Sequence, residues 1–138
     1  MENTQYIVVK EANREELIDL YKDAGWWLPE NDEDPSFVDR IVEKSFCFVI
    51  AVFENKIIGM GRSISDGISD AYIQDVVVLN KYRGKGIGGK IIDTIVDYLK
   101  SQKISWIGLI GEPGTQSFYE KHRFELMKNY IPMLFKDK

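Results

Sequence analysis

A single stretch in the second half of the chain most constrains its fold. Residues 72–79 (Tyr-Ile-Gln-Asp-Val-Val-Val-Leu) form a β-branched run of strand length, which favours an extended strand. Three residues later a glycine-rich turn begins at Arg83 and reads Arg-Gly-Lys-Gly-Ile-Gly-Gly. Residues 90–100 follow with a helical period, in which the apolar side chains are Ile91, Ile92, Ile95 and Leu99. The pattern predicts a strand, a tight turn and a helix in direct succession.

The turn has the features of an anion-binding site. Its glycines allow positive φ angles and let the backbone approach a ligand closely. The first N–H groups of the following helix have no partner within the helix, and they lie at the positive end of the helix dipole. Together these features predict a site for an anion, most simply a phosphate. The ordinary alternative is a tight turn that uses glycine only for its positive φ.

Three motif patterns fit these glycines. The dinucleotide fingerprint G-x-G-x-x-G begins at Gly84, and Glu112 follows its last glycine by 23 residues. The P-loop pattern is nearly satisfied, but Ile91 occupies the position of the magnesium-binding Ser or Thr. The third pattern, R-x-x-G-x-G from Arg83, resembles the loop that binds the acyl-CoA pyrophosphate in the GCN5-related N-acetyltransferases. Glycine spacing alone does not choose among the three.

The order of the predicted elements does choose. Periodicity and turn residues predict the order β-α-α-β-β-β-α-β-α-β-β, at residues 6–9, 14–24, 35–45, 46–53, 56–64, 72–79, 90–100, 104–110, 115–122, 124–127 and 131–135. A dinucleotide-binding domain normally opens with its fingerprint and then alternates strands and helices. Here more than half of the chain precedes the turn, including a hairpin. The P-loop interpretation also lacks a later strand that ends in a magnesium-binding aspartate. The acyl-CoA pattern therefore ranks first.

Composition excludes several function classes. The chain has 138 residues, a net charge of −4, a pI of about 5.1 and no basic stripe, so we expect no nucleic acid partner. Neither a signal peptide nor a membrane-spanning run is present, which predicts a cytoplasmic protein without a membrane partner. The single cysteine excludes an internal disulfide and a cysteine-based zinc site, and we expect no metal. This length predicts one domain, residues 1–138.

The element order, the R-x-x-G-x-G turn and the sequence Phe118-Tyr119-Glu120-Lys121 together resemble the GCN5-related N-acetyltransferase (GNAT) family. The resemblance covers residues 46–124. Segments 59–62 and 75–78 look most like small bacterial members related to arylalkylamine acetyltransferases. The resemblance implies an α/β (α+β) fold with a mixed, mostly antiparallel central sheet flanked by helices. It also implies a single N-acetyltransferase domain that uses acetyl-CoA as co-substrate.

The same resemblance implies which residues hold the coenzyme. Strands 72–79 and 104–110 would splay apart, and the pantetheine arm would pair with the backbone of Val76, Val77 and Val78 as an added strand does. The pyrophosphate would lie on the N–H groups of Gly84, Lys85, Gly86, Ile87, Gly88 and Gly89. The side chains of Arg83, Lys85 or Lys90 would add positive charge. Glu112 stands where many members have an asparagine that meets the coenzyme arm.

Tyr119 is the expected general acid. A tyrosine with a pKa near ~10 stays protonated at neutral pH and can protonate the departing thiolate. From the residues alone Tyr119 would be a core aromatic, and its position in the family motif favours the catalytic role. His122, near a helix end, is expected to be exposed, and Cys47 is expected to be a buried thiol. Transfer without an acyl-enzyme intermediate is therefore expected.

Asp75 is the candidate general base, acting on the amine directly or through water. Strand alternation would place it on one face with Ile73 and Val77. A charged residue in this apolar run needs a partner. An equally supported interpretation is therefore a structural carboxylate bound to a backbone N–H or to Arg62.

Trp26 and Trp27, followed by the acidic loop 30–34, could receive an apolar or cationic amine, because aromatic faces attract cations. A solvated loop with two packed tryptophans explains the pattern equally well. The expected activity is acetyl transfer from acetyl-CoA to a primary amine, more readily a small molecule than a protein. The alternatives are a nucleotide-binding oxidoreductase that uses residues 84–89 as a dinucleotide fingerprint, and a non-catalytic acyl-CoA-binding module. The apolar segment 131–135 could close the core or a homodimer face.

Overall fold

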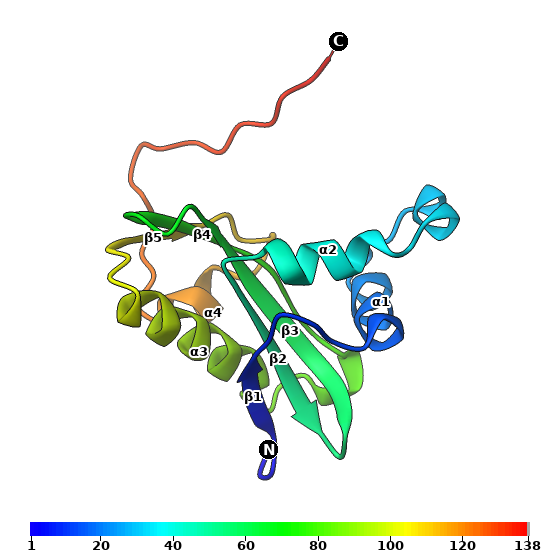
Figure 1. Cartoon of the computed structure of the whole chain (residues 1–138). Coiled ribbons are helices and arrows are strands. Elements are labelled where there is room, and N and C mark those ends of the chain that lie inside the picture. The colour runs from blue at the N-terminus through cyan, green and yellow to red at the C-terminus, as the bar shows by residue number, and fades with distance from the viewer. Residues whose placement is uncertain (138) are drawn as a thin grey trace.

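The computed structural model describes residues 1–137, which are built around one sheet (Figure 1). Its strands are ordered as they occur in the chain: β1 (Gln5–Val8), β2 (Cys47–Phe53), β3 (Lys56–Ser65), β4 (Asp70–Val78) and β5 (Trp106–Leu109). Neighbouring strands are antiparallel except β4 and β5, which are parallel. The β2–β3 hairpin turns through Glu54 and Asn55, whose positive φ angles of 50° and 63° suit a type I′ turn.

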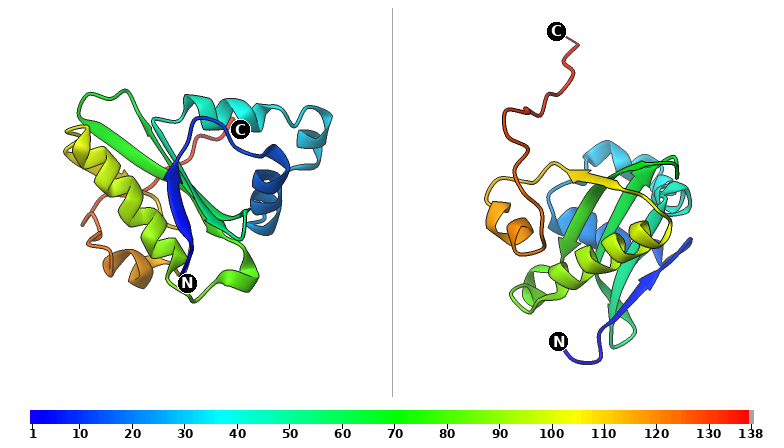
Figure 2. Two further views of the ribbon diagram at one scale, coloured as in Figure 1. Left: turned by 60° about the horizontal axis from the view of Figure 1, so that its bottom comes forward. Right: turned by 90° about the vertical axis from the view of Figure 1, so that its left-hand side faces the viewer.

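Helices cover both faces of this sheet (Figure 2), which confirms the mixed, mostly antiparallel sheet flanked by helices. α1 (Arg14–Asp23) and α2 (Phe37–Lys44) lie on one face, and α3 (Ile87–Ser101) lies on the other. The remaining elements are short: the 3-10 helices η1 (Pro29–Glu33) and η2 (Asn80–Tyr82), and the helix α4 (Gln116–Glu120). No helix within residues 1–137 is both long and apolar enough to cross a membrane.

An apolar stripe at helical spacing holds α3 to the sheet, and its members are Ile87, Ile91, Ile92, Ile95 and Leu99, all buried. Burial of one such side chain stabilises the fold by roughly 1.5–3 kcal/mol. Two glycines of β3 allow α3 to approach the strand closely. A Cβ at Gly61 would stand 2.8 Å from Ile91 Cγ2, and a Cβ at Gly59 would stand 3.0 Å from Ile91 Cδ1. The helix therefore lies directly on the backbone of β3.

A β-bulge interrupts β4 beside its pairing with β3. Met60 pairs with Val77 and Arg62 pairs with Gln74, so Gly61 alone faces both Asp75 and Val76. Asp75 has a φ of 57°, in the left-handed region that favours glycine.

The bulge reverses the side-chain alternation of β4. Ile73 packs with α3, whereas Val77 packs with α1 and α2. The expectation that Asp75 shares one face with Ile73 and Val77 is therefore wrong, because the extra residue moves everything after it to the opposite face.

The two late strands predicted at residues 124–127 and 131–135 do not form. The chain after α4 has no strand, and its last part runs away from the body of the protein (Figures 1 and 2). Alternating apolar residues supply the side chains of a strand, but a strand also needs a neighbouring backbone to pair with. Within residues 1–137 this segment finds no such neighbour. The β-α-α-β-β-β-α-β-α part of the predicted order is correct, and its two final strands are not.

Candidate functional site

The candidate site lies where β4 and β5 separate. The two strands pair only over residues 70–73 of β4 and 106–109 of β5. β5 ends there, whereas β4 continues to Val78. The backbone of residues 74–78 consequently has no strand beside it on the β5 side, and an extended ligand could pair with it. The expected coenzyme contacts Val76 and Val77 lie on this open stretch, together with Val78.

The glycine-rich turn continues from the open stretch. Gly84 and Gly86 have φ angles of 78° and 83°, and a Cβ on either would meet nothing within 4 Å. The first bond of α3 runs from the Lys90 N–H to the Gly86 carbonyl, over 3.2 Å. In the described chain the N–H groups of residues 84–89 donate to no carbonyl. This row of free N–H groups at the positive end of α3 suits an anion.

Gly88 and Gly89 have a second task besides presenting their N–H groups, because they let α4 pack against α3. A Cβ at Gly88 would stand 3.3 Å from Phe118 Cζ. A Cβ at Gly89 would stand 2.5 Å from the His122 ring, which lies 3.2 Å from Asp93 Oδ1 through Nδ1. The expectation of an exposed His122 is therefore wrong, since the ring lies half-buried over Gly89. The turn and α4 are thus joined into one unit.

The cationic side chains of the turn separate into two groups. Arg83 donates from Nε to the Val78 carbonyl over 2.8 Å, and its Nη2 lies 2.9 Å from Asp23 Oδ2. The Arg83 side chain therefore ties the turn to α1. Lys85 and Lys90 are exposed and form no ion pair within residues 1–137, so their charges are available to an anion on the turn.

Tyr119 lies half-buried on α4, in edge contact with Phe118 at 4.9 Å and Phe124 at 6.0 Å between ring centroids. Burial raises its pKa, and the negative charge of Glu112 raises it further. Its hydroxyl makes no hydrogen bond within the described chain. The phenol thus stays protonated at neutral pH and keeps its proton available.

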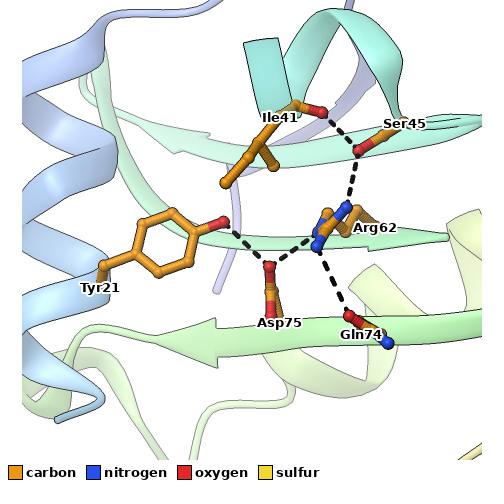
Figure 3. Close-up of polar contacts among 6 residues, drawn as sticks. All are labelled: Tyr21, Ile41, Ser45, Arg62, Gln74 and Asp75. Atoms are coloured by element: carbon orange, nitrogen blue, oxygen red, sulfur yellow. Dashed lines mark hydrogen bonds and ion pairs between the residues drawn. The ribbon is translucent and has the colours of Figure 1, made fainter. Parts of the chain in front are cut away.

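Asp75 is held in a polar network at the bulge, which Figure 3 shows. Its Oδ2 accepts from the Tyr21 hydroxyl over 2.9 Å and from Arg62 Nε over 2.7 Å. The side chains of Arg62 and Asp75 are only 16% and 22% exposed. Burial and the charge of Asp75 raise the pKa of Tyr21 well above its usual value, so Tyr21 remains a donor. The predicted Arg62 contact is present, and Oδ1 of Asp75 accepts no bond within residues 1–137.

The two tryptophans point to different places. Trp26 donates from Nε1 to Glu112 Oε1 over 3.3 Å, and its ring lies 6.3 Å from that of Tyr21. Trp27 instead stacks on Phe37 at 5.6 Å and donates to Asp32 over 3.0 Å. Trp26 therefore joins the candidate site, whereas Trp27 anchors the acidic loop.

Tyr21 is the site residue that sequence reasoning missed. On α1 it shares the helical spacing of the buried apolar residues Leu17, Ile18 and Leu20, and it links Asp75 to Trp26. The available signal was its hydroxyl, because a buried tyrosine needs a hydrogen-bond partner. Cys47 is buried as expected, and burial raises the pKa of its thiol to about 11, which keeps it from acting as a nucleophile.

Comparison with known proteins gives a consistent result. A model of the acetyltransferase (GNAT) family matches residues 8–124. The uncharacterized N-acetyltransferase ycf52 of Pyropia yezoensis is 31% identical over 120 residues, which cover 83% of this chain and 66% of that protein. The chloroplastic GCN5-related N-acetyltransferase 2 of Arabidopsis thaliana is 36% identical over 82 residues, which cover 59% of this chain and 32% of that protein. The chain thus spans less than two thirds of these curated relatives.

Solved structures show the same fold. A GNAT-family acetyltransferase from Streptococcus pneumoniae superposes with a TM-score of 0.82 over 98% of both chains, at 21% sequence identity. The chain therefore has the same overall fold as that protein.

Proposed function

Because the chain belongs to the GNAT family of acetyltransferases, we propose that it transfers an acetyl group from acetyl-CoA directly to a primary amine of a small molecule. The observation that carries this proposal is the open stretch of β4, which leads into a turn whose N–H groups are free. An extended arm that ends in a pyrophosphate fits this sequence of backbone features. Acetyl-CoA supplies a thioester whose carbonyl carbon the amine attacks.

The residues of the turn fit the coenzyme. Open space above Gly84 and Gly86 lets a pyrophosphate approach the backbone, and the N–H groups of residues 84–89 would hold it. Lys85 and Lys90 add positive charge. Arg83 contributes indirectly, since its side chain fixes the turn against α1. Glu112 faces Trp26, so we assign it to the acceptor side of the gap in place of the coenzyme contact.

The proposed reaction needs two proton transfers. The amine nitrogen forms a bond to the acetyl carbon, the carbon–sulfur bond breaks, and the nitrogen loses a proton. Tyr119 donates its hydroxyl proton to the departing sulfur, and its raised pKa keeps that proton in place until the thiolate forms. Asp75 takes the proton of the amine through its free Oδ1, directly or through water, while Arg62 and Tyr21 hold its other oxygen.

The acceptor would enter beside Trp26. Its indole offers an apolar face, and Glu112 adds a carboxylate that attracts a cationic amine. Trp27 is engaged with Phe37 and takes no part. We therefore expect amines with an aromatic or apolar body to be preferred.

Calorimetric titration of the purified protein with acetyl-CoA, NADH and ATP tests the proposal. We expect acetyl-CoA alone to bind, and an amine screen then to release free thiol. Gly86→Val should weaken acetyl-CoA binding, because its side chain enters the space above the turn. Gly25→Val is the matched control, since Gly25 also has a positive φ, 79°, and open space around it. Binding of NADH without acetyl-CoA would overturn the proposal, and coenzyme binding without turnover of any amine would leave a non-catalytic binding module.

A further inference from the structure

Glu112 is a carboxylate of the candidate site that has no cationic partner within residues 1–137. Asp75, the carboxylate at the bulge, differs in this respect, since its Oδ2 lies 2.7 Å from Arg62 Nε. Glu112 Oε1 instead accepts from the neutral indole of Trp26 over 3.3 Å, and Oε2 accepts no hydrogen bond in the described chain. The negative charge of Glu112 is therefore left uncompensated by this part of the protein.

The loop between β5 and α4 holds Glu112 in place. The Glu112 carbonyl accepts from the Thr115 hydroxyl over 2.6 Å and from the Thr115 N–H over 3.2 Å. The preceding residue, Gly111, is closely packed, because a Cβ there would stand 2.8 Å from Thr115 Oγ1 and 3.6 Å from Tyr119 Cδ2. The backbone of this loop is thus fixed against α4, and the Glu112 carboxylate faces Trp26, which is 86 positions away in the sequence.

A continuous series of contacts joins Glu112 to Asp75. Glu112 meets the indole N–H of Trp26, and the rings of Trp26 and Tyr21 lie 6.3 Å apart. The Tyr21 hydroxyl in turn donates to Asp75 Oδ2 over 2.9 Å (Figure 3). The two carboxylates therefore stand at the two ends of this series, with two aromatic side chains between them. An acceptor whose reacting nitrogen lies at Asp75 can pass beside the half-buried Trp26 and end at Glu112.

The charge of Glu112 becomes costly once the site is filled. Glu112 is exposed, so water solvates its carboxylate in the free protein. A bound acceptor displaces part of that water, and a carboxylate that leaves water without gaining a cation is destabilised. Burial raises the pKa of Tyr119, and the charge of Glu112 raises it further, which opposes proton release to the departing sulfur. A cation at Glu112 offsets both effects.

We propose that Glu112 and Trp26 select acceptors that carry a second, non-reacting cationic group, as linear diamines do. This inference rests on the proposed acetyl transfer and specifies its substrate class. One nitrogen loses its proton at Asp75 and attacks the thioester, while the other stays protonated, pairs with Glu112 Oε2 and lies against the indole of Trp26. Acetylation converts the first nitrogen into a neutral amide. In the reversed orientation that amide would not compensate Glu112, so a second transfer to the same molecule is slow.

Thiol release with matched amines tests this selection. Cadaverine, pentylamine and aminopentanol share one carbon chain, which ends in an ammonium, a methyl or a hydroxyl group, and putrescine with butylamine and hexamethylenediamine with hexylamine extend the comparison to other lengths. For the preferred length, kcat/KM for the diamine should exceed that for the monoamine and the amino alcohol about 10-fold or more. Glu112→Gln should reduce this ratio to about twofold or less. Asp32→Asn is the matched control and should retain the full ratio, because Asp32 accepts from the other indole, Trp27, over 3.0 Å. Mass spectrometry should show that the mono-acetylated diamine accumulates.

The indole signal of Trp26 tests the contact independently of acetyl transfer. Trp26, Trp27 and Trp106 each give an indole N–H signal in a two-dimensional NMR spectrum, and Trp26→Phe identifies that of Trp26. With coenzyme A present, the diamine should shift this signal in the natural protein but not in Glu112→Gln, and the monoamine should not shift it. A shift without turnover of any amine would overturn the proposed acetyl transfer and support the cation site. Equal turnover of diamines and monoamines at every length, an undiminished ratio in Glu112→Gln, or an unmoved Trp26 signal would overturn the selection and leave acetyl transfer standing wherever thiol is released.

Discussion

Tyr119 and Glu112 act on each other through charge, although the pair is separated in sequence by a turn and the start of α4. Replacing Tyr119 by Phe removes the proposed proton donor and preserves the ring that packs on Phe118. We expect kcat for thiol release to fall about 10²–10⁴-fold, with acetyl-CoA affinity within about twofold of the natural protein. Tyr98→Phe is the control, since Tyr98 packs on Phe46 away from the site. Undiminished turnover would end the role of Tyr119 as the acid.

The same pair predicts a pH effect. The charge of Glu112 helps to raise the pKa of Tyr119, so the acid stays protonated further into the alkaline range than a free tyrosine. Glu112→Gln removes that charge and keeps an oxygen for the Trp26 N–H. The pKa of Tyr119 should then fall, and the alkaline limb of the kcat profile should move to lower pH. Glu120→Gln should leave the limb in place, and an unmoved limb in Glu112→Gln would contradict the coupling.

The role of Asp75 can be assigned by measuring separately how its substitution changes the reaction rate and the stability of the fold. Asp75→Asn keeps an oxygen for Tyr21 but leaves the Arg62 guanidinium without its negative partner, which should cost about 1–3 kcal/mol of unfolding free energy. Because Asp75 is the proposed base, the kcat of the Asp75→Asn variant should also fall about 10²-fold or more. Tyr21→Phe removes one donor and keeps the carboxylate, so it should destabilise with a smaller loss of rate. Denaturant unfolding measures the loss of stability, and thiol release measures the loss of rate. Full turnover by a folded Asp75→Asn variant would assign Asp75 a structural role in place of the catalytic one.

At the scale of single residues, the sequence predicts those site residues that belong to a local motif. Tyr119 and the N–H groups of residues 84–89 belong to contiguous motifs, and the structure brings them together through Phe118 on Gly88. The Tyr21–Asp75 and Trp26–Glu112 contacts join residues 54 and 86 positions apart. No spacing rule predicts such contacts, because they depend on how α1 crosses the sheet.

At the scale of elements, the packing of α4 on α3 places the acid beside the turn. Alanine is normally a better helix residue than glycine, by about 1 kcal/mol. Gly89→Ala should nevertheless lower kcat, because its Cβ would stand 2.5 Å from the His122 ring and displace α4 with Tyr119. Adding His122→Ala should restore much of the rate by removing the clash. Kinetics of the single and double variants test this, and a Gly89→Ala enzyme with full activity would contradict the proposed coupling.

The helices and strands that the sequence predicts correctly have local causes, whereas those that it misses depend on distant parts of the chain. The strand, turn and helix around residues 72–100 form as predicted, since periodicity and glycine placement are local. The bulge at Asp75 was not predictable, because it depends on the register between β3 and β4. The late strands were predicted from alternation alone, and alternation does not supply a partner.

At the scale of the whole molecule, the candidate coenzyme site connects segments that are distant in the chain. β4, the turn and α4 meet there, and Arg83 extends the connection to α1 through Asp23. A ligand bound only by this folded arrangement should stabilise all of it. At 100 times its dissociation constant, acetyl-CoA should add about 2.7 kcal/mol to the unfolding free energy. For a chain of this size, that corresponds to a rise in Tm of roughly 10 °C.

Thermal unfolding followed by circular dichroism measures this rise without any assumption about the acceptor amine. Gly86→Val should lose most of the shift, because the coenzyme no longer reaches the N–H groups of the turn, whereas Gly25→Val should retain it. Tyr119→Phe should also retain the shift, since the phenol acts on the reacting sulfur and not on binding. A rise in Tm with NADH but none with acetyl-CoA would assign the turn to a dinucleotide. An equal rise in Gly86→Val would place the bound coenzyme away from the turn.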